Sequence, residues 1–309
     1  MSADVETMFY TREKPWHGLG TKVMEAPDSE GALVAAGLNW TVSQNPIYTG
    51  GNVIEGYRAN VRDSDSRVLG VVTDRYSVVQ NYEAFAFTDA LLGQGVCYET
   101  AGSLQGGRKV WLLARLPQEY IIAGEEITPY MVFFNSHDGS SCIRTAMTPV
   151  RVVCSNTLNL ALRTAKRSWA MKHTGNIGNK LKEAEETLLL SGQYMAALKR
   201  ELENLSMKKI TDRKVIKFIS MLCPVDENMT DQQKKNVLRL QEDLKLRYFE
   251  APDLKNTGSN AYRFVNAVSD FATHMEPLRR TENYKENLFM KTMDGNPLID
   301  RAYHMVLAA

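Results

Sequence analysis

The sequence is poor in cysteine and histidine, and neither is spaced to hold a metal ion. Four cysteines occur in 309 residues, with no CxxC or CxxH pair, and the five histidines form no HxH or HxxxH pair. Zinc sites need such pairs, and disulfide frameworks are rare in a cytosolic chain of this size. We therefore expect buried free thiols, no metal and no cofactor.

Long apolar runs are also missing. A membrane span needs about 20 consecutive apolar residues, and no stretch of the sequence approaches that length. Residues 1–12 are acidic and lack the basic and then apolar order of a signal peptide. We expect no membrane association and a cytoplasmic location.

Recognisable catalytic motifs are absent too. The sequence has no GxSxG elbow, HExxH helix or P-loop. His137 and Asp138 form half of a metal or acid/base site, although Asp138-Gly139 is more simply a turn dipeptide. A Mg²⁺-dependent nuclease site remains the least favoured alternative, because no ExK pair accompanies the candidate carboxylates Asp63, Asp65 and Asp74. We name no catalytic residue and expect the protein not to be an enzyme.

What is present in residues 1–175 is a series of strand pairs with polar turns. Alternating segments at 57–62 and 68–73, at 99–104 and 109–116, and at 130–135 and 142–148 are each joined by a short polar or glycine-containing connection. A strand at 40–48 and helices at 29–37, 81–92 and 155–163 complete this half. The pattern predicts an α+β fold, a curved antiparallel sheet with helices.

Residues 176–309 have helical periodicity instead. An amphipathic helix is predicted over 176–206, followed by helices at 212–222, 230–248, 259–274 and 297–306. The sequence therefore predicts a mixed β/α core domain at 1–175, which carries a basic segment, and a helical region at 176–309.

That basic segment, residues 139–182, contains no aspartate or glutamate and eight lysines or arginines. Since the whole chain carries +1, the remainder is acidic, and the segment's local field would attract a polyanion. Asn156, Asn159, Ser168, Trp169 and His173 are interleaved with these cations. Hydrogen-bond donors and a stackable ring among cations suit single-stranded nucleic acid.

We predict a nucleic-acid surface from two sources, this segment and the turn 106–109. In that turn, paired glycines would give two cations the freedom to reach a phosphate. Arg58, Arg62, Arg67 and Arg75 would extend the surface if they share a face. The predicted binding residues are Arg108, Lys109, Arg144, Arg151, Arg163, Lys166, Arg167, Trp169 and Lys172. The alternative is a basic face that pairs with acidic helices or with a neighbouring subunit.

Three motifs together resemble one family. They are Pro15-Trp16-His17-Gly18-Leu19-Gly20, TPVRVVCSNTLNL at 148–160 and NAYRFVNAVSDFATH at 260–274. The chain resembles the phage- and plasmid-related family known as domain of unknown function nine-three-two. Tyr262-Arg263 departs from the tryptophan-containing pattern expected in relatives. In the first motif we expect Trp16 to pack in the core and the glycines to form a tight turn.

The resemblance implies a phage, prophage or plasmid setting and, if phage-encoded, the host cytoplasm. The order of predicted elements is also similar to that of ring-forming single-strand annealing recombinases, which is an analogy of fold. We therefore expect a single-stranded DNA binding and annealing protein that acts stoichiometrically as a homo-oligomer. The alternative is an interaction protein that contacts a host or phage protein through its helical half, inhibits a host defence system or sequesters a ligand.

Overall fold

The computed structural model describes residues 5–11, 20–24, 27–92, 97–116, 120–151, 156–157, 167–175, 178–179, 191–275 and 295–309. The chain forms two compact units. Unit 1 consists of Met1–Gln118, Tyr130–Met147 and Ser168–Ser191, and unit 2 of Glu119–Pro129, Thr148–Arg167 and Gly192–Ala309. The chain passes between the units at several points, two of them inside strands. The division into regions 1–175 and 176–309 stays a prediction.

Unit 1 is built on a sheet whose strands run in the order β10-β9-β7-β6-β1-β2, with β12 paired to β10. Their bounds are β1 Val5–Tyr10, β2 Thr21–Lys22, β6 Cys97–Leu104, β7 Lys109–Arg115, β9 Glu125–Ser136, β10 Ile143–Arg151 and β12 Ser168–Met171. The pairs β1/β6, β6/β7, β7/β9 and β10/β12 are antiparallel. The short pair β1/β2 is parallel.

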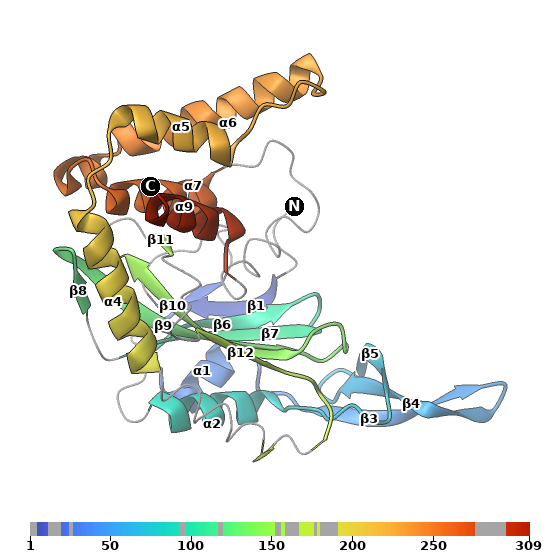
Figure 1. The fold of residues 1–309 in the computed structure, drawn as a ribbon. Coiled ribbons are helices and arrows are strands. Elements are labelled where there is room, and N and C mark those ends of the chain that lie inside the picture. The colour runs from blue at the N-terminus through green and yellow to red at the C-terminus, as the bar shows by residue number, and fades with distance from the viewer. Residues whose placement is uncertain are drawn as a thin grey trace. The chain divides into compact units, whose positions relative to one another are not determined.

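A second, three-stranded antiparallel sheet in unit 1 has the order β3-β4-β5. It comprises β3 Val42–Thr49, β4 Asn52–Arg62 and β5 Arg67–Thr73, and its long β3/β4 hairpin projects from the unit (Figure 1). At the base Asn60 and Arg62 are buried, whereas towards the tip Tyr48 and Tyr57 are exposed. The sheet is therefore held at one end only.

Two helices, α1 Ser29–Ala35 and α2 Asn81–Leu92, pack on the main sheet of unit 1 (Figure 1). Asp28 caps α1 by accepting a hydrogen bond of 2.8 Å from the backbone N–H of Gly31. The core between helix and sheet is aromatic: Phe85 contacts Tyr98, and Phe87 contacts Phe133, at ring-centroid distances of 5.2 and 5.9 Å. Such rings supply most of the buried apolar area.

Unit 2 is largely helical. It contains α4 Ser191–Met207, α5 Asp212–Leu222, α6 Asp231–Phe249, the 3₁₀ helix η1 Pro252–Thr257, α7 Ala261–His274 and α9 Pro297–Leu307. The short strands β8 Tyr120–Ile122 and β11 Asn156–Thr157 pair with the ends of β9 and β10. Helix α7 lies at the centre, where Phe264 contacts both Phe218 of α5 and Tyr248 of α6.

Most predicted elements are confirmed. The α+β class, the second strand pair with its turn and the helices at 81–92, 212–222, 230–248, 259–274 and 297–306 agree with the structure to within one or two residues. The first strand pair is confirmed as β4 and β5, although β4 begins at Asn52, five residues before the predicted start. The third predicted pair corresponds to β9 and β10, which are neighbours in the sheet. Within the described residues, no helix has the length and apolar character needed to cross a membrane.

Two helix predictions need correction or lie partly outside the description. The helix predicted at 155–163 is wrong at Asn156–Thr157, which form β11 by pairing with Val150 and Arg151. The apolar run there suits a strand as well as a helix. The rest of that prediction lies outside the described residues. The helix predicted at 176–206 is confirmed from Ser191 onwards as α4, and residues 176–177 and 180–190 lie outside the described residues.

Candidate nucleic-acid interface

The described part of the acid-free segment is centred on the strand pair β10/β12. Its antiparallel register places Arg144 opposite Ala170 and Thr145 opposite Trp169. Directly opposed residues point to the same side of a sheet, and successive residues alternate between sides. Arg144 and Trp169 therefore point to opposite faces.

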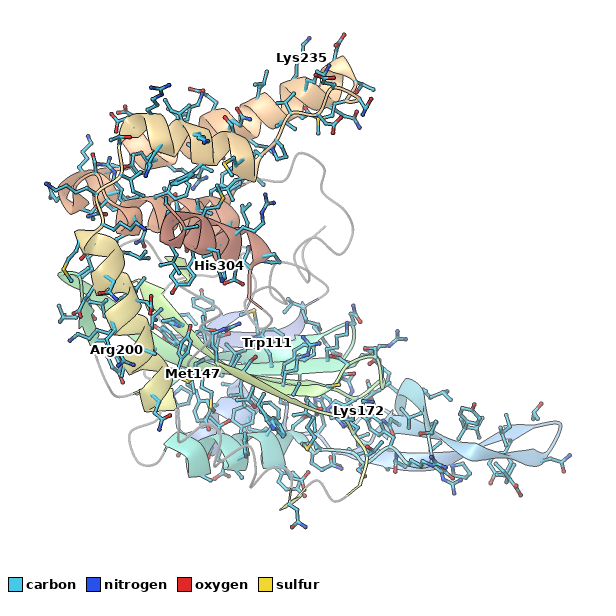
Figure 2. The ribbon with its side chains drawn as sticks, viewed as in Figure 1. Trp111, Met147, Lys172, Arg200, Lys235 and His304 are labelled. Atoms are coloured by element: carbon cyan, nitrogen blue, oxygen red, sulfur yellow. The ribbon has the colours of Figure 1, made fainter. Side chains whose placement is uncertain are left out.

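The face that carries Arg144 is the more open one on β12. Ser168 and Ala170 are exposed, as is Lys172 just beyond the strand, whereas Met171 on the other face is buried. Figure 2 shows Lys172 where the chain leaves β12. This face thus carries half-buried Arg144 and exposed Lys172, and its own segment supplies no carboxylate.

Trp169 is half-buried on the opposite face, beside Thr145. Among the described residues β12 pairs with β10 alone, so in this part of the chain β12 is an edge strand. A nucleic-acid strand that contacts both Trp169 and Lys172 would have to pass over this edge. The stacking role of Trp169 stays a prediction.

The second predicted source of cations, the turn between β6 and β7, is tight and carries an exposed arginine. Gln105, Gly106 and Gly107 all have positive φ, at 54°, 68° and 86°, and Arg108 is exposed. A Cβ on Gly107 would lie 2.9 Å from Nη1 of Arg62. The glycine therefore serves close packing at this turn as well as turn geometry.

Lys109 begins β7 and is half-buried, and its charge acts on Asp138. Burial alone would raise the pKa of Asp138. The pKa is nevertheless below its ordinary value, because Ser136 and Ser140 donate hydrogen bonds to the carboxylate and Lys109 supplies positive charge. Part of the electrostatic effect of Lys109 thus acts within the protein.

Two of the four arginines that were expected to extend this surface, Arg62 and Arg67, form ion pairs within the protein. Arg62 forms ion pairs with Glu6 at 2.9 Å and with Asp65 at 2.6 Å, and its side chain is only 8% exposed. Arg67 also pairs with Glu6, at 3.2 Å. Hydrogen bonds from Arg62 keep the pKa of Glu6 below its ordinary value, despite the opposing effect of burial. This network closes off Arg62 from a phosphate, while its guanidinium lies over the ring of Trp40.

The remaining predicted residues are distributed unevenly. Arg151 ends β10 and pairs with Asn156, and Arg167 is 8% exposed, which leaves little of it for a ligand. Arg163 and Lys166 lie outside the described residues. The structure thus brings Arg144 and Lys172 to one strand pair, places Arg108 and Lys109 at a separate turn, and buries Arg167.

Two buried histidines form a cluster that the sequence did not reveal. His137 is fully buried, its Nε2 lies 3.0 Å from Oδ1 of Asn81, and its ring meets Trp40 edge to face. His173 stacks on Tyr76, and its Nδ1 donates to the carbonyl oxygen of Ser77 at 3.1 Å. From the sequence, His137 was a candidate for half of a metal or acid/base site and His173 for the nucleic-acid surface, and the structure buries both.

Burial and, to a smaller extent, the nearby His173 together lower the pKa of His137 to about 3, despite the opposing charge of Asp138. Burial also lowers the pKa of His173. Both imidazoles are therefore neutral near pH 7 and contribute no charge to a phosphate. Among the residues that can be described, no three His, Cys, Asp or Glu side chains come together to hold a metal ion.

The distinctive first motif falls mainly outside the described residues, at 15–19. Its last residue, Gly20, has φ +100°, and a Cβ there would lie 2.7 Å from Cγ of Met8. Only glycine fits this conformation and spacing. That observation agrees with the tight turn expected of the motif, and Trp16 and His17 stay without a structural assignment.

These features define an α+β protein with an acid-free basic strand pair at a sheet edge. The family Domain of unknown function (DUF932) matches residues 68–292. The chain belongs to this family. No curated protein and no solved structure matches the chain.

Proposed function

We propose that this chain is a stoichiometric single-stranded DNA binding and annealing protein of the phage and plasmid type, which acts as a homo-oligomer in the cytoplasm. The observation that supports it is the strand pair β10/β12, where Arg144 and exposed Lys172 share a face to which their segment contributes no carboxylate. Cations on an exposed strand can follow a phosphate backbone without reading base sequence.

The arrangement favours binding over catalysis. The nearest acid/base candidates, His137 and His173, are buried and neutral near pH 7 and are used for packing. Asp138 accepts hydrogen bonds from Ser136 and Ser140. A role in which phosphates are gripped while bases stay free to pair needs no such groups, and in it no cofactor is consumed.

The test is fluorescence anisotropy of a labelled single-stranded oligonucleotide and the matching duplex, at low and moderate salt. The variant Arg108→Glu/Lys172→Glu reverses one exposed charge at each of the two predicted sources of cations, the β6/β7 turn and the end of β12. The control, Lys235→Glu/Arg239→Glu, reverses two exposed charges on α6. We expect the first variant to weaken single-strand binding about tenfold or more at low salt, since each reversed charge removes one contact and adds a repulsion.

The control should stay within about twofold of the unaltered protein. Equal losses in both variants would contradict the assigned surface. Absence of single-strand binding at low salt would contradict the function itself. A strand-pairing assay with two complementary oligonucleotides then separates annealing from binding alone, because an annealing protein must accelerate duplex formation.

A further inference from the structure

Helices α5 and α9 of unit 2 border an open, shallow groove of about 500 Å³. Its lining residues come from the end of α5 and from α9 and are Met221, Pro297, Asp300, Arg301, His304 and Met305. The guanidinium of Arg301 donates a hydrogen bond of 3.0 Å from Nη2 to the backbone carbonyl of Met221. That bond fixes the two walls of the groove to each other.

The floor of the groove is apolar and adaptable. Met221, in the last turn of α5, is 50% exposed, and Ile216 of the same helix is 46% exposed, whereas Val215, Phe218, Ile219 and Leu222 are buried. Methionine side chains are flexible and polarizable, and for this reason they recur at surfaces that receive different apolar side chains. Met221 and Met305 thus form an apolar site that can contact an aliphatic or aromatic side chain.

The rim of the groove is mainly basic. Lys217 lies one helical turn before Met221 and is exposed, and Arg301 and His304 are exposed on α9. Nδ1 of His304 donates to the carbonyl oxygen of Asp300 at 2.7 Å. Among the described residues that line the groove, Asp300 is the one acid.

We propose that this groove binds an acidic amphipathic peptide segment of a partner protein. An apolar side chain of the segment enters between Met221 and Met305, and its carboxylates meet Arg301 and Lys217. This is the helix-in-groove mode of recognition, with charge complementarity at the rim. A phosphate backbone fits less well, because it has no apolar side chain to enter between Met221 and Met305.

The probe is a fluorescein-labelled synthetic helical peptide of leucine and glutamate, with leucines at i, i+3, i+4 and i+7. Two comparison peptides are a scrambled peptide of equal composition and a version with lysine in place of glutamate. With the full chain we expect saturable binding of the acidic helix with a Kd of about 10 μM. The scrambled and lysine peptides should bind at least about tenfold more weakly, since one loses the apolar stripe and the other the complementary charge.

Three variants locate the site. Arg301→Glu and Met221→Asp should each weaken binding about tenfold or more, and His304→Glu should weaken it by a smaller factor. Because His304 is exposed, the last variant keeps the test decisive if either of the first two fails to fold. Lys235→Glu is the matched control; Lys235 lies at the beginning of α6 while His304 is on α9 (Figure 2). The control should bind like the unaltered protein.

Four results would overturn the proposal. They are absence of saturable binding up to about 1 mM, equal affinity for the lysine peptide, affinity unchanged by all three variants, and a change of oligomeric mass in Met221→Asp that makes the groove a contact between copies. A peptide of residues 276–294 that bound more tightly than the acidic helix would also overturn it, because the chain itself would be the ligand.

The proposal is independent of nucleic-acid binding, which was assigned to unit 1. If a single-stranded oligonucleotide displaced the peptide and Arg301→Glu lost both ligands equally, the groove would belong to a nucleic-acid surface, and the peptide proposal would be wrong. If the oligonucleotide did not bind at all while the peptide did, the peptide proposal would stand and the function proposed above would fail.

Discussion

The side-chain amide of Asn60 donates a hydrogen bond of 2.7 Å to the backbone carbonyl of His137. Both residues are fully buried. One belongs to β4 of the projecting sheet and the other follows β9 of the main sheet, so this bond ties the two sheets of unit 1 together. Gly70 of β5 reinforces the junction, because a Cβ there would lie 2.6 Å from Cα of Asp138.

We predict that Asn60→Ala lowers the free energy of unfolding by about 1–3 kcal/mol, because a buried carbonyl loses its donor. Urea denaturation followed by circular dichroism measures the change. Asn52→Ala is the control, since Asn52 is exposed at the other end of the same strand; it should change the free energy by less than about 0.5 kcal/mol. Equal effects of the two substitutions would show that the bond does not anchor the sheet.

Burial of His137 predicts that acid destabilises the protein. Its pKa is about 3 in the folded protein and 6.5 ordinarily, so the unfolded chain binds the proton more readily between these values. This contribution to stability is fully present above pH 6.5 and is lost as the pH falls towards 3. For one such group, the free energy of unfolding falls by about 2 kcal/mol between pH 8 and pH 5. The pKa of His173 is also lowered, so His173 changes the free energy of unfolding in the same direction.

The check is the urea midpoint of His137→Gln at pH 8 and pH 5. The variant should be less stable than the unaltered protein at pH 8, because the contact with Asn81 is lost, and it should lose less stability on acidification. His304→Gln alters an exposed histidine and should keep the original pH dependence. If His137→Gln lost as much stability between pH 8 and pH 5 as the unaltered protein, His137 would not be the titrating group.

Two glycines with positive φ separate backbone strain from close packing. Gly50 has φ +55°, and a Cβ there would have no neighbouring atom within 4 Å, whereas Gly107 has φ +86° and its Cβ would lie 2.9 Å from Nη1 of Arg62. We expect Gly50→Ala to cost about 1 kcal/mol from left-handed strain alone. Gly107→Ala should cost at least about 1 kcal/mol more, because it displaces Arg62. Thermal or urea unfolding compares them, and equal costs would contradict the packing role of Gly107.

Much of the fold could be predicted from the sequence because the local signals agree with the tertiary structure. Asp63, Ser64, Asp65 and Ser66 between alternating segments indicate a turn, and the structure has the β4/β5 hairpin there. Thr230 and Gln233 form the capping box that begins α6. Asn156 and Thr157 were assigned to the wrong class because their strand is defined by a partner, β10, rather than by their own pattern.

For the candidate site, the sequence predicts which residue types the segment contains but not which way their side chains point. The absence of carboxylates around Arg144 is visible in the sequence, but the opposite orientations of Arg144 and Trp169 depend on the register of β10 and β12. Likewise Arg62 is not available to a ligand because it forms an ion pair with Glu6, which is 56 residues away in the sequence. The burial of His137 gave no local signal, because its position in a polar turn suggests exposure.

The opposite faces of β12 give the last prediction, which rests on the proposed function. Lys172→Ala removes a cation, so it should lower affinity for a single strand and reduce the slope of log K against log salt by about 0.7. Trp169→Ala removes a ring that releases no counterions, so it should lower affinity by about 1–3 kcal/mol with the slope unchanged. The two side chains lie on different faces of an edge strand of the sheet. If single-stranded DNA wraps that edge, the losses of binding free energy from the two substitutions should therefore add in the double variant.

Anisotropy titrations over a salt series measure the affinity and the salt slope. Loss of affinity in Lys172→Ala but not in Trp169→Ala would confine the strand to the Arg144 face, and the reverse result would place it on the face of Trp169.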